Sequence, residues 1–512
     1  MAADGETYTF NLRQGVTFSN GDPFNSYQVW GDIYGLYFID ANSSAFMNGY
    51  NMFNTTAVRF GPATITLMNQ SGLVNPSSAL MNIMTNSSWP IYVTGPNTIV
   101  FHLSSPFNFF VGTLISVGGL LFDTQYVLQH GGFGTPGSFN TYFNQNPIPG
   151  TGPYAVTKVS ENSFVEFSQN PTYWGRNLTQ AQISANPYID PGHFKNVVIS
   201  AKTDDISRYV DLSTGVTQLS SIYGSDYALV QNNSKYGQLS LGKDSNLFYI
   251  ISLNTQRYPT NITLVRQAIV HAINYSNLAK VAFYGGITQY NGPSVPADGA
   301  YYNFGNQSVV DYFNLTLAKQ EIAAAKLSSP PTITYLASST CSICSNIAEA
   351  IQGDLQNIGI NVNIQIDTES SFSSLMYLTY AQNVNMSQQI PQMASMGGFF
   401  APTDDTPIDW WIYLVSNSSL VFNDAVYSNP IVQPCVKDLI GTTNTTLIQS
   451  ACTTAQEQIN NDVPYIFLGL PNLPFGTGTI VWNKAMVNGG FVDPTSMGDS
   501  TTMVFNTVTP AS

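Results

Sequence analysis

The chain has 512 residues, with 16 lysines and arginines against 30 aspartates and glutamates, and so a formal net charge of −14. A chain of this length is expected to form two or three domains. The acidic balance, with basic residues scattered singly, argues against a nucleic-acid-binding protein. No run of residues approaches the 18 or more apolar positions of a membrane-spanning helix.

Charged residues make up only 9% of the sequence, whereas about a quarter is typical of globular proteins. Asn, Gln, Ser, Thr and Tyr take their place on the expected surface. Because these groups do not titrate near neutral pH, such a surface keeps an almost constant charge as the pH falls. We therefore hypothesise that the protein faces an acidic exterior.

The first predicted elements lie in residues 8–29, YTFNLRQGVTFSNGDPFNSYQV. Tyr8 and Phe10 alternate with polar residues as in a half-buried strand, and Asn20-Gly21 is typical of a tight turn. Pro23 suits the entry to a helix, which we expect over residues 24–37.

Residues 150–175, GTGPYAVTKVSENSFVEFSQNPTYWG, predict a β-hairpin. Glycines and a proline mark its entry, and residues 154–159 and 164–167 alternate apolar with polar side chains. Residues 161–163 form the expected turn, and the exit is an Asn-Pro turn followed by two aromatic residues.

Helix and strand patterns alternate after this hairpin. Helices are predicted over residues 207–215, 264–283, 317–325 and 346–358, and strands over residues 218–220, 332–336 and 361–366. This alternation is typical of an α/β domain.

Four segments resemble, in the same chain order, the extracytoplasmic solute-binding proteins of ABC transporters, in particular the dipeptide and oligopeptide-binding family (family 5). They are the LRQGVTF strand, the GTGPY to NPTYW hairpin, the strand-helix pair LFYIISLNTQRYPTNITLVRQAIVHAIN at 247–274, and QNIGI at 356–360 followed by AQEQINNDVPYIFLGLPN at 455–472. The resemblance implies an α/β, two-lobed, periplasmic-binding-protein-like fold of the class II type with an extra accessory domain.

The resemblance also implies a domain order. Residues 1–149 are expected to form the accessory domain, 150–254 the first ligand-binding lobe, 255–470 the second lobe, and 471–512 a return to the first lobe. Family members normally carry a sizeable segment before the first strand, so we expect the N-terminal domain to be incomplete through truncation, a split gene, or strands supplied by a second polypeptide. Residues 249–255 and 465–471 are the expected hinge.

The function implied by the resemblance is capture of a solute between the lobes and its delivery to an ABC permease. A peptide is the first choice and an oligosaccharide the alternative. In peptide-binding members, an acidic loop of the second lobe holds the peptide α-amino group, and residues 396–416, MGGFFAPTDDTPIDWWIYLVS, correspond to it. The candidate ligand-binding residues are Tyr249, Asn254, Asp404, Asp405, Trp410, Trp411 and Tyr465, although core packing is an equally good interpretation of each aromatic.

Classes other than a binding protein fit less well. A nucleophile elbow, a HExxH helix, a P-loop and a dinucleotide glycine fingerprint are all missing from the sequence. Asp404, Asp405 and Asp409 cluster in one loop, whereas a glycoside hydrolase needs two opposed carboxylates and a calcium loop needs EF-hand spacing. A structural surface-layer protein would show internal repeats. We therefore expect no enzyme activity, cofactor or metal site.

The four cysteines are interpreted as two disulfides, Cys341–Cys344 and Cys435–Cys452, consistent with an oxidising exterior. The second pair flanks a turn-rich stretch between two helical patterns, so it would link a helical hairpin. The competing interpretation of Cys341 and Cys344 is a redox motif or half of a zinc site, although a second CxxC is missing and the four histidines show no ligand spacing.

Asn-x-Ser/Thr sequons also point outside the cell. The sequence has thirteen such sequons, and one of them, at Asn274, lies on an expected buried helix. The last residues, TVTPAS, are similar to the start of a stalk. We therefore expect a cell-surface protein that is membrane-anchored in its full-length form. The glycosylation candidates are Asn42, Asn54, Asn69, Asn86, Asn177, Asn232, Asn261, Asn306, Asn314, Asn385, Asn417 and Asn444.

Overall fold

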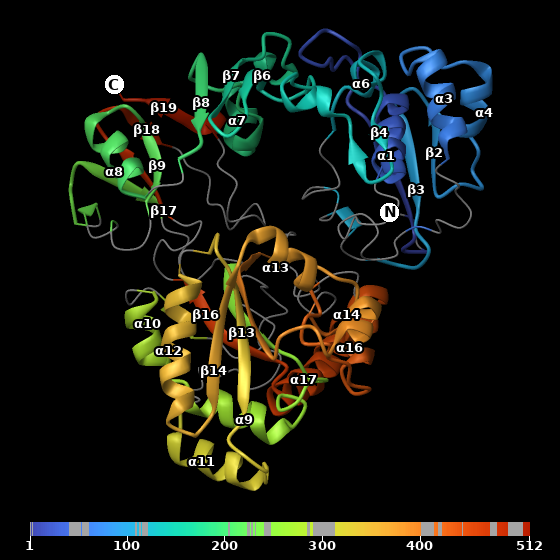
Figure 1. Cartoon of the computed structure of the whole chain (residues 1–512). Coiled ribbons are helices and arrows are strands. Elements are labelled where there is room, and N and C mark those ends of the chain that lie inside the picture. Colours follow the sequence, from blue (N-terminus) through green and yellow to red (C-terminus); the bar gives the residue numbers. More distant parts are fainter. Residues whose placement is uncertain are drawn as a thin grey trace. The chain divides into compact units, whose positions relative to one another are not determined.

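The computed structural model describes residues 4–39, 61–107, 121–202, 205–222, 232–239, 247–283, 287–289, 313–341, 343–400, 414–417, 422–442, 444–471, 479–489 and 505–511, and single residues at 2, 53, 110, 111, 114, 226, 229 and 230. The chain divides into two compact units, which Figure 1 shows coloured along the sequence. Unit 1 comprises Met1–Ser207, Asn483–Val492 and Met503–Ser512, and unit 2 comprises Arg208–Trp482 and Asp493–Thr502.

Unit 1 begins with the predicted strand, β1 (Thr7–Asn11). It forms an antiparallel sheet in the order β1-β3-β2 with β2 (Ile91–Gly95) and β3 (Thr98–His102). The predicted helix is α1 (Ser26–Ile39), which packs on β2 and β3. It begins a few residues later than the sequence predicts, and the Trp30 indole of α1 donates a 3.0 Å hydrogen bond to the Ile91 carbonyl.

The GTGPY to NPTYW segment forms the predicted hairpin. It consists of β6 (Tyr154–Ser160) and β7 (Phe164–Gln169), and β8 (Asn196–Ser200) adds a third antiparallel strand. Asn162 occupies the turn with a φ of 56°, a conformation that asparagine tolerates better than most residues. The fully buried Asn170 amide donates a 2.9 Å hydrogen bond to the Gly152 carbonyl, so the exit turn is bonded to the glycine-rich entry.

The end of the chain returns to unit 1. The Asn506 amide donates hydrogen bonds to the carbonyls of Tyr188 (3.1 Å) and Asp190 (2.8 Å). The other elements of unit 1 are α3 (Pro62–Ser71), α4 (Ser78–Met84), α6 (Thr124–Gln129), β4 (Gly134–Thr135), β5 (Ser138–Phe139), α7 (Gln180–Ala185), β18 (Val487–Gly489) and β19 (Val508–Pro510).

A six-stranded sheet forms the centre of unit 2, in the order β12-β16-β11-β15-β13-β14. The β13–β14 and β13–β15 pairs are parallel, and the other pairs are antiparallel. The strands are β11 (Leu247–Leu253), β12 (Ile287–Thr288), β13 (Thr332–Ser338), β14 (Asn361–Asp367), β15 (Met393–Phe400) and β16 (Tyr465–Pro471).

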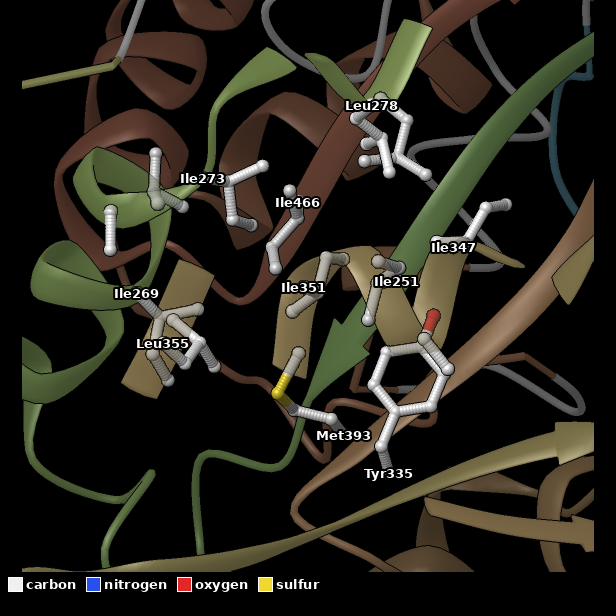
Figure 2. Packing of buried hydrophobic residues seen from close by; sticks show 14 of the residues in the cluster. Ile251, Ile269, Ile273, Leu278, Tyr335, Ile347, Ile351, Leu355, Met393 and Ile466 are labelled. Atoms are coloured by element: carbon white, nitrogen blue, oxygen red, sulfur yellow. The ribbon is translucent and has the colours of Figure 1, made fainter. Parts of the chain in front are cut away.

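Apolar clusters lie on both faces of this sheet. Ile333, Tyr335 and Ala337 of β13 join the larger cluster, part of which Figure 2 shows, while Leu336 joins a second cluster. This alternation follows from the period of two in a strand. The larger cluster includes residues of α9 (Thr263–Ala272), α10 (Tyr275–Val281), α11 (Leu315–Ala324) and α12 (Cys344–Gln356), and the second includes residues of α13 (Glu369–Met376) next to α14 (Tyr380–Met386).

The single helix predicted over residues 264–283 is wrong in one respect, because the chain forms two helices there. Ile273 is extended (φ −71°, ψ 122°), and the Asn274 side chain accepts a 3.0 Å hydrogen bond from the Asn277 amide as the N-cap of α10. A capping asparagine favours a new helix start over a helix interior.

A second sheet of unit 2 has the order β10-β17-β9. Its core comprises Leu212, Ile222, Val230, Tyr236 and Val481. The elements are α8 (Asp205–Thr214), β9 (Leu219–Ile222), β10 (Tyr236–Leu239) and β17 (Thr479–Asn483).

The two expected hinge segments lie side by side in the six-stranded sheet. Ile250 of β11 pairs with Phe467 of β16, and Ser252 with Tyr465. The border expected between the two lobes, at residues 254/255, directly follows β11. Both neighbours of β11 in the sheet, β15 and β16, belong to unit 2. The four-part division and the hinge stay predictions.

Both expected disulfides are present. Cys435–Cys452 links α16 (Gln433–Gly441) to α17 (Thr445–Asp462) with the Cα atoms 5.1 Å apart, which is the helical hairpin that the sequence predicts. In the Cys341–Cys344 disulfide, Cys341 lies just before α12 and Cys344 is the first residue of that helix, with the two Cα atoms 5.4 Å apart. In the part of the chain that the structure describes, every helix is too short or too polar to cross a membrane.

Nine of the described sequon asparagines are exposed, and the tenth, Asn274, is half-buried. Asn314 and Asn444 also cap α11 and α17 by accepting hydrogen bonds from backbone amides. Asn42, Asn54 and Asn306 lie outside the described residues, and glycosylation stays a prediction. The exposed sequon asparagines are Asn69, Asn86, Asn177, Asn232, Asn261, Asn314, Asn385, Asn417 and Asn444.

Candidate functional site

The predicted ligand loop, residues 396–416, is described only at its two ends. Residues 401–413 lie outside the described residues, and with them the candidates Asp404, Asp405, Trp410 and Trp411. The loop leaves β15 at one end and returns at residues 414–416. We call these two ends, together with the residues that contact them, the loop base.

The first end of the loop base is an interior strand. β15 pairs with β11 over Leu247↔Phe400 to Leu253↔Met393, and with β13 at its beginning. At the loop end of β15 the printed pairs, Gly398 to Phe400, are with β11, whereas the pairs with β13 lie at Met393 and Ala394. The start of the loop is therefore held to the sheet through β11.

Tyr465 of β16 secures the other end. Its hydroxyl donates a 2.9 Å hydrogen bond to the Leu414 carbonyl and lies 3.3 Å from the Phe422 carbonyl, while the Ala425 amide donates to it at 3.4 Å. Tyr465 is 2% exposed, and burial raises the pKa of its phenol well above the usual range, so it stays a neutral donor. Tyr465 thus has an anchoring role, and its direct contact with a ligand stays a prediction.

Asn254 also has a structural role. It is 1% exposed, its amide group donates to the carbonyls of Ser387 (2.8 Å) and Ile390 (3.1 Å), and its side-chain oxygen accepts from the Gln256 amide (3.0 Å). These bonds join the end of β11 to the turn that precedes β15. Three of its hydrogen-bonding positions are therefore used within the chain, and ligand contact by Asn254 stays a prediction.

Tyr249 lies in the core of unit 2. It is 3% exposed and packs edge-on against Phe283 with ring centroids 5.1 Å apart. The core-packing interpretation therefore describes its environment in this structure.

A buried carboxyl group, Asp424, belongs to the loop base and is not suggested by the sequence. It is fully buried, and within the described ranges neither carboxyl oxygen has a hydrogen-bond partner. Burial raises the pKa of Asp424 well above its usual range, and the nearby Asn383 amide offsets this only in part. The Asn383 side-chain oxygen is likewise buried without a hydrogen-bond partner in the described part of the chain.

Arg266 of α9 links the end of α17 to the region beside the loop base. Its Nε donates to the carbonyls of Asp462 (2.7 Å) and Val463 (3.2 Å). The Asp462 carboxylate in turn accepts 2.7 Å bonds from the Tyr427 hydroxyl and the Asn429 amide. Burial lowers the pKa of Arg266 to about 10, so the guanidinium remains charged at neutral pH.

A pocket of about 370 Å³ lies next to β16. The His271 Nδ1 and a Glu321 carboxylate oxygen are 2.8 Å apart in its wall, which also includes Gln267 and Asn461. The sequence does not predict this His271–Glu321 pair, because the two residues are 50 positions apart and His271 has no other histidine or cysteine at metal-ligand spacing. Within the described ranges, no three His, Cys, Asp or Glu side chains gather as a metal site requires.

The protein-family comparison decides the identity of the chain. The model of "Bacterial extracellular solute-binding proteins, family 5 Middle" matches residues 1–419. The chain belongs to this family. Family membership confirms the resemblance seen in the four sequence segments, and it places the protein among extracellular binding proteins rather than enzymes, as expected.

Individual relatives are distant but extensive in coverage. The chain is 24% identical over 508 residues to the glutathione-binding protein GsiB of Pectobacterium atrosepticum, covering 97% of this chain and 82% of that protein. It is 26% identical over 395 residues to the nickel-binding periplasmic protein of Escherichia coli, covering 72% of this chain and 62% of that protein.

The fold is that of a solved family 5 protein. The periplasmic binding protein DppA of Helicobacter pylori, in complex with the peptide STSA, matches with a TM-score of 0.69 at 19% identity, covering 100% of this chain and 88% of that chain. The expected two-lobed α/β fold is therefore confirmed.

Proposed function

We propose that this protein captures a peptide, or a similar oligomeric solute that carries an amino group, and delivers it to an ABC permease in the membrane. The observation that carries the proposal is the membership in family 5 together with a loop, residues 396–416, one end of which lies in β15 and the other of which is bonded to Tyr465 of β16.

The chemistry of this loop suits a peptide. A protonated α-amino group needs a carboxylate when it leaves water, and Asp404 and Asp405 supply one in the loop. Trp410 and Trp411 supply large apolar surface for side chains. The relatives named for glutathione and for the peptide STSA bind ligands of this class.

Capture of the solute is a shift of populations. The proposed hinge segments, 249–255 and 465–471, would absorb the rotation of the lobes, and a solute that binds the closed form more tightly draws the equilibrium toward it. The permease would recognise this closed form.

The test is calorimetric titration of the whole chain with separate ligand classes. We expect heat from a mixture of peptides of two to five residues, and none from cello-oligosaccharides, malto-oligosaccharides or a nickel–histidine complex. Heat from the sugars alone would replace the peptide with the oligosaccharide alternative, and heat from the nickel complex alone would favour the function of the E. coli relative.

Variants connect the heat to the loop. The double variant Asp404→Asn with Asp405→Asn, and separately Trp410→Ala, should weaken peptide binding by about tenfold or more each. Glu457→Gln, which removes one exposed negative charge on α17, serves as the control and should bind as the wild type does.

The location of the protein follows from the family, whose members are extracellular or periplasmic. Anchoring of a longer form to the membrane and completion by a second polypeptide are further predictions of the sequence. Both are tested by recovering the native protein from its cells and determining its mass, membrane association and partners.

A further inference from the structure

The Cys341–Cys344 disulfide lies at the junction of a β-α-β unit. β13 ends at Ser338, Cys344 is the first residue of α12, and β14 returns parallel to β13. Figure 1 shows α12 lying along both strands. A CxxC motif between a strand and the start of a helix in such a unit is the arrangement typical of thiol–disulfide redox centres.

The two sulfur atoms have different environments. Cys344 is 1% exposed, and the buried Ser395 hydroxyl of β15 donates a 3.2 Å hydrogen bond to its Sγ. Cys341 is partly exposed. A thiolate from outside can therefore reach Cys341, whereas Cys344 is shielded and already has a hydrogen-bond donor.

A further buried donor lies near Ser395. The Tyr335 hydroxyl of β13 is fully buried, has no hydrogen-bond partner among the residues that the structure describes, and lies within interaction range of Ser395. Figure 2 shows this hydroxyl directed toward the side of α12 on which Ile347 lies. Tyr335 can thus support Ser395 when negative charge forms on Cys344.

The other disulfide has none of these features. Cys435 and Cys452 are both 0% exposed and join two helices across a sequence separation of 17. It therefore serves as an internal control for the reactivity of Cys341–Cys344.

We propose that Cys341–Cys344 is a thiol–disulfide exchange site that accepts two electrons from a dithiol outside the cell. The proposal is independent of the captured solute and goes beyond the proposed transport function.

The exchange proceeds in two steps. A thiolate of the dithiol attacks the Sγ of Cys341, the bond between the two cysteine sulfurs breaks, and its electron pair goes to Cys344, which leaves as a thiolate and takes up a proton. The second thiol of the dithiol, as its thiolate, then attacks the sulfur atom that the dithiol contributed to the mixed disulfide. The bond to Cys341 breaks, and Cys341 leaves as a thiolate and is protonated in turn. The dithiol becomes an intramolecular disulfide, and two electrons and two protons have passed to the cysteines.

Cys344 is the better leaving group for electrostatic reasons. It lies in the first turn of α12, where the helix dipole favours negative charge, and Ser395 donates to it. The carboxylate of Glu369 accepts a 2.9 Å bond from Thr340, the residue before Cys341, so a negative charge already lies near that side. A leaving thiol of lower pKa departs faster.

The test is graded reduction of the folded whole chain with dithiothreitol, followed by iodoacetamide and mass spectrometry of the cysteine peptides. We expect the Cys341 and Cys344 thiols to be alkylated at a dithiothreitol concentration at least about tenfold lower than the Cys435 and Cys452 thiols, with an unchanged circular dichroism spectrum. A smaller separation, or opening of Cys341–Cys344 only when the spectrum is lost, would overturn the proposal.

A variant tests the role of Ser395 in the exchange. Ser395→Ala should slow reduction of Cys341–Cys344 by about threefold or more, because the leaving thiolate loses its donor. Ser252→Ala is the matched control, since Ser252 is a buried serine on the neighbouring strand whose hydroxyl donates to the Ala394 carbonyl. Equal rates for both variants would show that Ser395 has no part in the exchange.

Discussion

The hydroxyl of Tyr465 donates a 2.9 Å hydrogen bond to the carbonyl oxygen of Leu414, 51 residues earlier in the chain. This bond joins β16 to the C-terminal end of the predicted ligand loop. Since both residues are buried, the carbonyl has no water to replace the phenol if it is removed.

Tyr465→Phe should therefore lower the free energy of unfolding by about 1–3 kcal/mol, because a buried carbonyl loses its donor. Chemical denaturation followed by circular dichroism measures this difference. Tyr258→Phe is the control, since Tyr258 is 52% exposed, and it should change stability by less than about 0.5 kcal/mol. Equal losses in the two variants would remove the anchoring role of Tyr465.

Replacement of Arg266 by lysine should also destabilise the protein. Lysine cannot reproduce the guanidinium contacts with the Asp462, Val463 and Thr260 carbonyls, and we expect a loss of about 2–4 kcal/mol. Arg257→Lys should cost clearly less, because the half-buried Arg257 donates mainly to the Ile390 carbonyl at 2.8 Å. Denaturation curves for the two variants make the comparison, and a larger loss for Arg257→Lys would contradict it.

The two disulfides should differ in their contribution to stability. In the loop-entropy description, closing the 17-residue separation of Cys435–Cys452 is worth about 3 kcal/mol, and closing the separation of three in Cys341–Cys344 about 1.5 kcal/mol. Thermal unfolding of the two double Cys→Ala variants should show the larger fall in Tm for the 435/452 pair. The reverse order would indicate that Cys341–Cys344 is a structural bond.

The stability of the folded protein should increase as the pH falls from neutral, whereas many proteins lose stability on acidification. Burial, as the largest cause, raises the pKa of Asp123 to about 6, against about 3.9 in the unfolded chain. Since the folded pKa is the higher one, its contribution is fully present below about pH 4 and is lost as the pH rises through about 6. Burial raises the pKa values of Asp32 and Asp424 in the same direction.

We therefore expect Tm to rise as the pH falls from 7 to about 4–5. Below that range, Glu369 acts in the opposite sense, because its hydrogen bond from Ser338 lowers its pKa. Asp123→Asn should flatten the rise, as asparagine can still accept the 3.0 Å cap bond from the Tyr126 amide. A steady fall in Tm over this range, or a secondary-structure signal lost by about pH 3, would contradict both this prediction and the hypothesis of an acidic exterior.

Local patterns in the sequence predict much of the fold. The β6–β7 hairpin is predicted by glycine, proline and asparagine residues that mark its turn and its two ends. The α16–α17 hairpin is predicted by two helical patterns that flank a turn, with a cysteine on each side. These features depend on neighbours within about 30 residues. The break between α9 and α10 is also local, but the cap preference of Asn274 is small and the apolar pattern on both sides of it continues as in a single helix.

The loop base could not be predicted, because it depends on pairing over long separations. Tyr249 and Tyr465 resemble ligand-binding aromatics in sequence, yet their strands lie side by side in one sheet although more than 200 residues separate them. Likewise, the polarity of Asn254 and Asp424 does not reveal whether the side chain meets a ligand, a carbonyl or only the core. Burial decides this, and burial follows from the tertiary fold.

The measurement that tests the central claim most directly is a calorimetric comparison of a peptide with its N-acetylated form, in the wild type and in the Asp404→Asn, Asp405→Asn variant. We predict that acetylation weakens binding to the wild type by about tenfold or more, because the charged amino group is lost, and has little effect in the variant. Equal binding of both peptides to the wild type, or binding of oligosaccharides alone, would contradict the account.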